Sequence, residues 1–191
     1  SFTSMNLPRL AIEAMREAGD MIPDGNKHAI RKEAREIFLE SVRKTATMMA
    51  EQLYERYCFQ RTALARQFPF MMSNDVWKGG GRLQPNDEVG DVLKHGTLTV
   101  GFIGLAECLK ALIGKHHGES EEAQELGLKI VGFIREKADK KAAETKLNFS
   151  VIATPAEGLS GKFVRLDRKR FGSIEGITDK DYYTNSFHIP V

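Results

Sequence analysis

Three short β-rich runs of this sequence each lead almost directly into a helical pattern. The junctions are NLPR (residues 6–9), GFIGLAE (101–107) and ATPAEGLSG (153–161). Because helices separate successive strands, the connections must cross over, and crossover connections produce a mostly parallel sheet. We therefore predict an α/β fold with the element order β-α-α-loop-β-α-α-β-α-loop-β. The expected strands are residues 2–7, 97–103, 149–153 and 186–191.

The charge balance gives no indication of a polyanionic partner. The chain has 28 Lys and Arg against 26 Asp and Glu, a net charge of +2. Neither nucleic acid nor an anionic membrane is therefore expected to bind. We interpret the basic run at 165–170 as a solvated helix face. No apolar run reaches the roughly 18 residues of a membrane span, and no signal peptide is visible, so we expect a cytoplasmic protein.

The cysteines and histidines do not form a metal-binding pattern. Cys58 and Cys108 have no CxxC partner, so neither a disulfide framework nor a zinc site is predicted, and we interpret both as buried thiols. His116 and His117 have no second ligand cluster nearby. The triple glycine at 79–81 is interpreted as a surface loop, because no Gly-Lys-Ser/Thr follows it.

The junction at 153–161 has features of an anion site. We expect Thr154 to cap a helix, with Pro155 at its first position and Glu157 at its third. Gly158 and Gly161 allow close approach of the backbone. Helix N-termini at the carboxyl ends of parallel strands bind anions. The residues leave two interpretations open, a site for a phosphate chain or ribose and a capped structural helix.

Both ends of the chain are apolar and strand-like. The chain begins SFTSMNLPR and stops at FHIPV. Because native termini are usually polar and loosely held, we expect both ends to be cut from a longer protein. His188 lies in the final apolar run. Two interpretations of it remain open, a buried core histidine and a site residue.

Four stretches resemble, in order and spacing, the catalytic subunit of the anaerobic (class III) ribonucleoside-triphosphate reductases. They are SFTSMNLPRLAIEA (1–14), DEVGDVLKHGTLTVGFIGLAECLKAL (87–112), FSVIATPAEGLSGKF (149–163) and GITDKDYYTNSFHIPV (176–191). The resemblance covers nearly all of the chain, and its last motif is long and unusual. It implies that residues 1–191 are the central part of the reductase catalytic barrel, as one incomplete domain.

The resemblance implies a ten-stranded α/β barrel of the glycyl-radical enzyme type, with several long helices. In that family a separate S-adenosylmethionine-dependent activase makes the glycyl radical, which generates a thiyl radical on a finger-loop cysteine. The thiyl radical takes the 3′-hydrogen of the ribonucleoside triphosphate, and the ribose 2′-hydroxyl is replaced by hydrogen. The parent is expected to be a homodimer with a structural zinc.

Much of that machinery is expected outside this chain. The resemblance places the finger-loop cysteine before Ser1, and the glycyl-radical loop and zinc site after Val191; the ATP-cone is also absent. We therefore expect no catalytic residue, metal ligand or bound cofactor here, and no activity from the piece alone. Its expected partners are the substrate nucleotide, the rest of the parent chain and, through absent regions, the activase.

Substrate binding is the family function that the resemblance implies for residues of this chain. The resemblance of ATPAEGLSG places Thr154, Ala156, Glu157 and Gly158 near the triphosphate and ribose, mostly through backbone N–H groups.

Three further residues are expected at or near the site by resemblance. Asn6 is expected close to the radical cysteine, and Asn185 and His188 belong to a motif expected to line or brace the barrel. Some family members carry tyrosine where this chain has Ile152. Because Ile152 lacks the polar group of that tyrosine, the resemblance does not imply that formate, and not a thiol system, is the reductant.

Two functions of other classes stay open. One is a stand-alone nucleotide-binding or regulatory module without catalysis, and the other is a structural or interaction domain whose glycines serve only packing.

Overall fold

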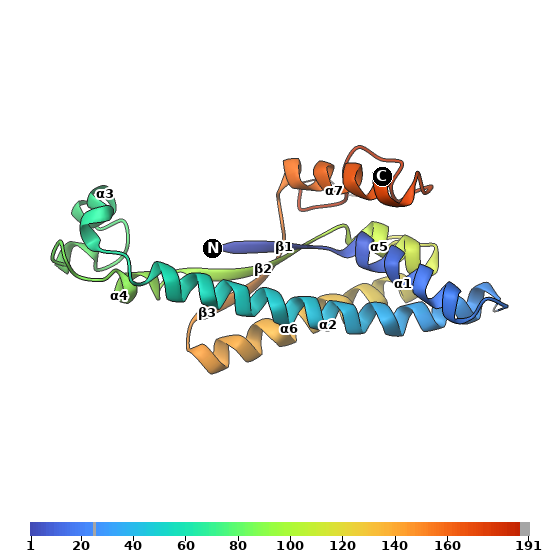
Figure 1. Ribbon diagram of the computed structural model, residues 1–191, viewed down its shortest axis with the longest axis horizontal. Coiled ribbons are helices and arrows are strands. Elements are labelled where there is room, and N and C mark those ends of the chain that lie inside the picture. The colour runs from blue at the N-terminus through green and yellow to red at the C-terminus, as the bar shows by residue number, and fades with distance from the viewer. Residues whose placement is uncertain (25, 188–191) are drawn as a thin grey trace.

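The computed structural model describes residues 1–24 and 26–187, and it shows an elongated α/β structure (Figure 1). Its helices and strands, in chain order, are β1 (Phe2–Asn6), α1 (Leu7–Met21), α2 (Lys27–Gln60), the 3-10 turn η1 (Ala65–Gln67), α3 (Pro69–Ser73), the 3-10 turn η2 (Gly80–Arg82), α4 (Gly90–Leu93), β2 (Thr97–Ile103), α5 (Leu105–Ile113), α6 (Glu121–Thr145), β3 (Asn148–Ala153) and α7 (Glu157–Phe171).

The three strands form one parallel sheet in the order β1-β2-β3. The strands β1 and β2 pair from Phe2 opposite Thr99 to Asn6 opposite Ile103, and β2 continues into β3 with Phe102 opposite Ala153. The predicted parallel α/β arrangement is thus confirmed for these strands. All three carboxyl ends meet at one edge, where α1, α5 and α7 begin.

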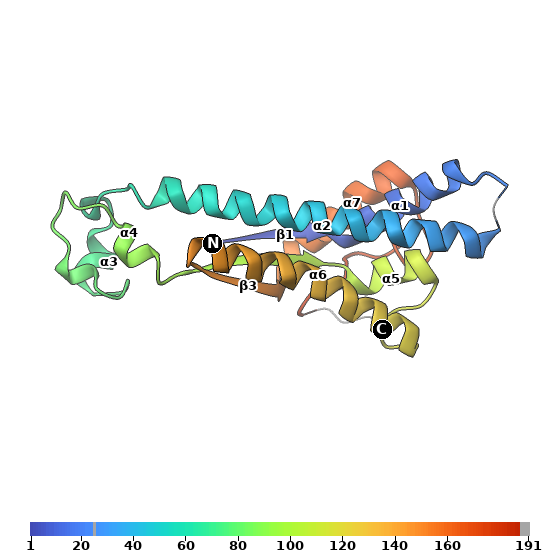
Figure 2. The same cartoon turned by 90° about the horizontal axis from the view of Figure 1, so that it is seen from below.

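The two faces of the sheet differ because side chains alternate along each strand. On one face, Met5, Leu98, Val100 and Phe102 join the main hydrophobic core with α2 and α6. These two long helices lie side by side along that face (Figure 2). The other face carries Phe2, Ser4, Thr99, Gly101, Ser150, Ile152 and Thr154, and we call it the hydroxyl face.

The helix boundaries follow from local caps. The Asn6 side chain accepts a hydrogen bond from the backbone N–H of Arg9, and Pro8 occupies the first turn of α1. The Ser120 hydroxyl accepts from the Ala123 N–H at the start of α6. In α2, buried positions recur at helical spacing from Ala34 to Leu53, so one continuous stripe faces the core.

Residues 61–96 form a protrusion at the amino end of β2, which we call the arm (Figure 1, left). A single antiparallel bridge between Leu64 and Glu88 closes its base. It contains α3, α4 and both 3-10 turns. Its small core consists of Ala65, Met72, Val89 and Val92.

The expected fourth strand at 186–191 lies mostly outside the described residues. Within the described part, Ser186 and Phe187 belong to a bend and not to a strand. Among residues 1–24 and 26–187, no helix combines the length and apolar composition needed to cross a membrane.

Candidate ligand site at the carboxyl ends of the strands

A pair of hydroxyl groups bridges the two outer strands of the sheet. The Ser4 Oγ of β1 lies 2.7 Å from the Thr154 Oγ1 just after β3, although β2 runs between them. The bridge passes over Gly101. A Cβ atom there would lie 2.0 Å from Thr154 Oγ1 and 2.9 Å from Ser4 Oγ. Glycine is therefore required for space, so that the two hydroxyls meet on the hydroxyl face.

The N-terminus of α7 has no side-chain cap among the described residues. The helix begins at Glu157 with Ala156 as N-cap. The prediction that Thr154 caps this helix is wrong. Its backbone N–H donates to Phe102 O at 3.0 Å, extending the sheet ladder, and its hydroxyl is engaged with Ser4. The first turn of α7 thus presents the Gly158 N–H and the positive end of the helix dipole without a side-chain cap, whereas the Glu157 N–H donates to Pro155 O at 3.1 Å.

A mainly apolar hollow of about 240 Å³ lies beside this N-terminus. Its walls are Phe2, Thr99, Ile152, Thr154, Pro155 and Ala156. Of the predicted ligand residues, Thr154 and Ala156 therefore share one hollow, while Glu157 and Gly158 are exposed to solvent. Four predicted residues are thus brought to one corner of the molecule.

Asn6 belongs to a buried polar network at the same end of the sheet. Its Nδ2 donates to Asp167 Oδ2 at 2.8 Å. The Arg9 Nε donates to Asp167 Oδ1 at 2.7 Å, and the Tyr183 hydroxyl donates to Oδ2 at 2.9 Å. Asp167 and Tyr183 are fully buried. Burial, and next the charge of Asp167, raise the pKa of Tyr183, so its hydroxyl remains a proton donor.

The interpretation of residues 165–170 as a solvated helix face is wrong for part of the run. Asp167 is fully buried, and Arg168 Nε donates to Thr178 O at 2.6 Å. The spacing of residues along α7 already indicated that Asp167 is buried. Ser160, Val164 and Asp167 recur at helical intervals, so the small and apolar residues of α7 define a buried face that includes Asp167.

A second buried carboxylate fixes the segment that returns after α7. Glu107 of α5 accepts from Lys180 Nζ at 2.7 Å. It also accepts from the Thr184 hydroxyl at 2.9 Å and from the Thr184 N–H at 3.1 Å. The Gly104 N–H, at the end of β2, donates to Thr184 O at 2.7 Å. Residues 180–187 are therefore held across the strand ends.

Asn185 connects the returning segment to the first turn of α7. Its Nδ2 donates to Ser160 Oγ at 3.1 Å, and its Oδ1 accepts from the Phe187 N–H at 2.8 Å. Ser160 Oγ in turn donates to Glu157 O at 2.7 Å. Asn185 thus supports the segment that carries Glu157. Its contact with a ligand stays a prediction, and His188 lies outside the described residues.

No metal site is evident in the part of the chain that the structure describes. No group of three or more His, Cys, Asp or Glu side chains lies close enough there to hold an ion. Cys108 is buried, and burial raises the pKa of its thiol well above the usual value. Cys58 is only partly buried, contrary to its interpretation as a core thiol. The His116 Nδ1 accepts from the Gly118 N–H at 3.0 Å, which stabilises its own turn.

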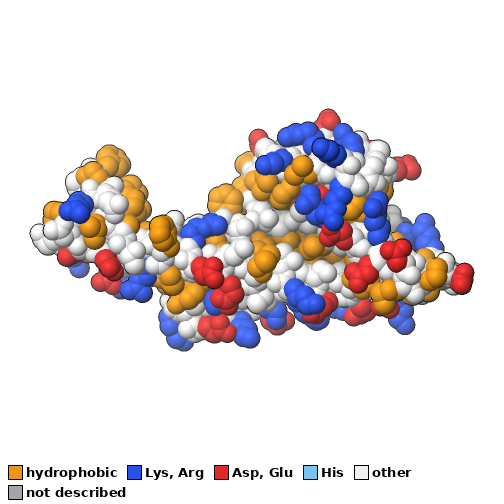
Figure 3. Space-filling view, in the orientation of Figure 1, with side chains coloured by type: hydrophobic (Ala, Val, Ile, Leu, Met, Phe, Trp, Pro, Cys, Tyr) orange, Lys and Arg blue, Asp and Glu red, His pale blue; other side chains and the backbone are white. Residues whose placement is uncertain are grey.

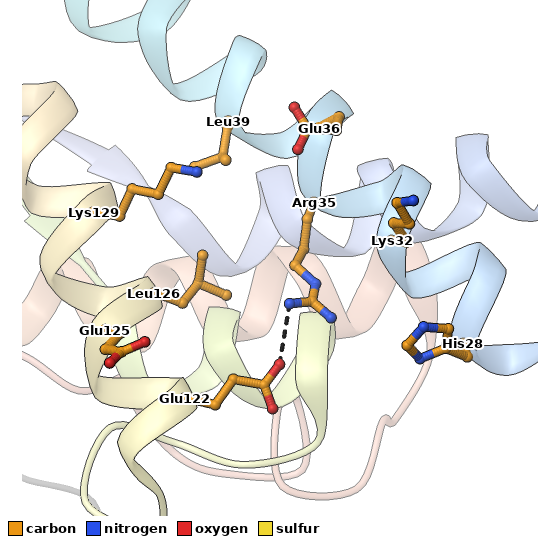
Figure 4. Close-up of a pocket in the computed structure, with 9 residues that line it drawn as sticks. All are labelled: His28, Lys32, Arg35, Glu36, Leu39, Glu122, Glu125, Leu126 and Lys129. Atoms are coloured by element: carbon orange, nitrogen blue, oxygen red, sulfur yellow. Dashed lines mark hydrogen bonds and ion pairs between the residues drawn. The ribbon is translucent and has the colours of Figure 1, made fainter.

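A separate hollow of about 510 Å³ lies between α2 and α6 (Figure 4). It carries Lys32, Arg35 and Lys129 together with three glutamates, and Arg35 pairs with Glu122 at 3.1 Å. Because its charges largely offset each other, the groove offers no net field for a charged substrate. It also lies on the side of the sheet that α2 and α6 cover, opposite the hydroxyl face.

Ligands of parallel α/β proteins gather outside the carboxyl ends of the strands, where this chain collects its predicted residues. The fold is that of part of an α/β domain, and this corner is its candidate ligand site. A family model described as "Anaerobic ribonucleoside-triphosphate reductase" matches residues 1–191, the whole chain. The chain belongs to the anaerobic ribonucleoside-triphosphate reductase family, whose members are oxidoreductases.

Curated relatives with the same name support this assignment. The chain is 34% identical to the anaerobic ribonucleoside-triphosphate reductase of Haemophilus influenzae, over 98% of this chain and 24% of that protein. It is 28% identical to that of Enterobacteria phage T4, over 98% of this chain and 27% of that protein. The chain therefore spans about a quarter of the length of these relatives.

Solved structures show the same fold. The anaerobic ribonucleotide reductase from Thermotoga maritima with dATP bound in the specificity site aligns with a TM-score of 0.63 at 21% identity, over 98% of this chain and 27% of that one. A structure of the Thermotoga maritima enzyme in complex with dATP and CTP aligns with a TM-score of 0.59, also at 21% identity, over 98% of this chain and 26% of that one. The long helices and parallel strands therefore match a portion of those larger proteins.

Proposed function

We propose that this chain is the central part of the catalytic barrel of an anaerobic reductase that converts ribonucleoside triphosphates to deoxyribonucleoside triphosphates. The glycyl and thiyl radical chemistry is assigned to parts of the parent outside these 191 residues, as are the structural zinc and the contacts with the activase. This piece supplies barrel strands and substrate contacts. The family match supports the proposal, as does the relative whose structure is described as a complex with dATP and CTP.

The observation that carries the proposal is the uncapped N-terminus of α7 beside the hydroxyl pair. A triphosphate is strongly anionic, and the backbone N–H of Gly158, at the positive end of the α7 dipole, presents partial positive charge to it. The adjoining hydroxyl face suits the ribose, because Thr154 and Ser4 hold their hydroxyls in a fixed geometry. The Glu157 carboxylate is repelled by phosphate, so its side chain is assigned to a ribose hydroxyl, which donates to it.

Asn6 and Asn185 act in this proposal mainly by positioning. The amide of Asn6 joins the end of β1 to Asp167 of α7, and Asn185 supports the α7 turn through Ser160. The Asn6 amide still has hydrogen-bonding capacity toward a ligand, because it has two N–H donors and two oxygen lone pairs and uses one of each for Asp167 and Arg9. His188 keeps its predicted role near the site by resemblance alone.

The test uses the complete parent protein with its activating enzyme under anaerobic conditions. The variant Gly158→Asp adds a carboxylate to the first turn of α7, and a side chain at this position meets no atom within 4 Å, so the fold should persist. Repulsion of the triphosphate should raise KM by about tenfold or more, which corresponds to about 1.4 kcal/mol. The matched control is Gly132→Asp on α6, where the added side chain also enters open space and KM should not change.

An unchanged KM in Gly158→Asp would contradict the assignment of the triphosphate to α7. The 191-residue piece alone should show no turnover. If the parent has no reductase activity while the piece binds a nucleoside triphosphate as a stable monomer, a stand-alone nucleotide-binding module becomes the better assignment.

A further inference from the structure

The arm carries an apolar groove that the proposed function does not use. The groove has a volume of about 450 Å³, and its apolar walls include Phe59, Phe68, Trp77 and Leu93. The rings of Phe68 and Trp77 pack together with centroids 5.0 Å apart. Figure 3 shows hydrophobic side chains gathered on the arm, away from the main body. The groove thus has rigid aromatic walls and an open mouth.

Among the residues that line this groove, Phe59 is unusual for its high exposure to solvent. It lies on the last turn of α2, and 82% of its surface is exposed. Phe70 and Val76 are also exposed on the same arm. Single exposed apolar residues are common in soluble proteins, but Phe59 forms a wall of an apolar groove, and that combination indicates a binding surface.

Ser1 is held at the amino end of the sheet by several hydrogen bonds. The Ser1 nitrogen donates to Thr97 O at 2.9 Å, and Ser1 O accepts from the Thr99 N–H at 2.8 Å, so sheet pairing already begins at this residue. The Arg56 guanidinium of α2 donates to Ser1 Oγ at 2.8 Å. The beginning of β1 is thus fixed in direction between β2 and α2.

A small hollow joins Ser1 to the groove. Ser1, Gln60, Leu93 and Gly96 all line this hollow, and Gln60 and Leu93 also line the groove on the arm. A strand advances about 3.3 Å per residue. A chain that continued β1 backward would therefore pass Gly96 and reach the groove within a few residues.

We propose that the groove binds the segment of the parent polypeptide that immediately precedes Ser1, in an extended conformation with an apolar side chain against Phe59. This inference rests on the proposed function, in which the parent chain continues before Ser1. The arm then anchors the chain as it enters the central strand system. It also explains why the exposed Phe59 lies at the amino end of the sheet, where the polypeptide enters.

The test places a photocrosslinking residue in the groove of the complete parent protein. The variant Phe59→p-benzoylphenylalanine keeps an aromatic side chain at an exposed position. Irradiation, proteolysis and mass spectrometry then identify the attached peptide. We expect the attachment to fall within about ten residues before Ser1, a reach of about 33 Å for an extended chain. The matched control is Phe70→p-benzoylphenylalanine, which is 69% exposed on the same arm but does not line the groove.

Three results would overturn the inference. These are attachment of position 59 to a distant part of the parent, attachment to a second subunit, and no attachment above that of position 70. A second measurement uses Phe59→Ser, which should speed proteolytic cleavage just before Ser1, whereas Phe70→Ser should not. Reductase activity is assayed separately on the unlabelled parent. An inactive parent that crosslinks as expected would overturn the proposed function and leave the docking intact.

Discussion

The two ends of the same sheet are held together by different kinds of contact. At the carboxyl end, two buried carboxylates, Asp167 and Glu107, each accept at least three hydrogen bonds from distant parts of the chain. At the amino end, the arm has a core of four apolar residues, and Phe59 at the end of α2 is exposed beside it. One end is fixed by polar ties and the other by a small apolar cluster.

This difference indicates which end is built to hold a fixed geometry. A buried carboxylate without its donors costs several kcal/mol, so the network tolerates few alternative arrangements. The elements of the arm contact mainly one another, and the arm would gain apolar contacts from a segment that covers its groove. We therefore assign ligand positioning to the carboxyl end and docking of the parent chain to the amino end.

The largest expected effect comes from breaking the polar end. The variant Asp167→Ala leaves the Arg9 guanidinium without its carboxylate and Tyr183 without its acceptor. We expect a loss of about 3–5 kcal/mol in the free energy of unfolding, toward the lower end because Arg9 keeps some contact with solvent. Chemical denaturation followed by circular dichroism measures it. The control Asp139→Ala breaks an exposed pair with Arg135 and should cost at most about 1 kcal/mol. Equal losses in both variants would contradict the assigned role.

An intermediate effect is expected at the hydroxyl bridge. The variant Gly101→Ala drives a methyl group into Thr154 Oγ1 and should cost about 1–3 kcal/mol of unfolding free energy through overpacking. When Gly101→Ala is combined with Thr154→Ala, the added methyl group should cost less unfolding free energy, because the nearest clashing atom, Thr154 Oγ1, is gone. Gly132 lies at an exposed position in the middle of α6, so Gly132→Ala should instead increase the unfolding free energy by up to about 1 kcal/mol. Additive effects of the first two changes would contradict the contact.

The smallest global effect is expected in the arm. The variant Met72→Ala removes a buried side chain of the arm core and should loosen the arm by about 2 kcal/mol. Because the arm contacts the sheet little, global unfolding should shift by less than about 0.5 kcal/mol. Trp77 is the only tryptophan of the chain, so its fluorescence reports on the arm, while amide exchange reports on the strands. A large loss of protection in β2 would show that the two ends are not independent.

The sequence predicted the strands and their junctions well, because glycine, proline and β-branched residues act locally. The β2 boundaries at 97–103 and the Ser120 cap of α6 were obtained from pattern alone. Family resemblance predicted that Thr154, Ala156, Glu157 and Gly158 lie near the triphosphate and ribose. The structure places them at the junction of β3 and α7, and their contact with a ligand stays a prediction.

The failures have a common physical cause in contacts between distant parts of the chain. The cap at Thr154 was lost because its hydroxyl pairs with Ser4, a residue from the other end of the chain. Asp167 was taken as solvated because its partners, Asn6 and Tyr183, lie in other segments. Local pattern indicates which side chains are polar, but only the tertiary fold decides which polar groups are removed from water.

The hydroxyl bridge and the Asn6 contact also constrain the order of events during synthesis. Ser4 and Thr154 are 150 residues apart in sequence, and Asn6 and Asp167 are 161 apart. The first strand therefore leaves the ribosome long before its partners exist, and β2 and the C-terminal third must follow before these ties form. Such long-range topology slows folding and leaves an early strand edge exposed. Until those partners are made, the newly made β1 has no strand beside it to accept its backbone hydrogen bonds.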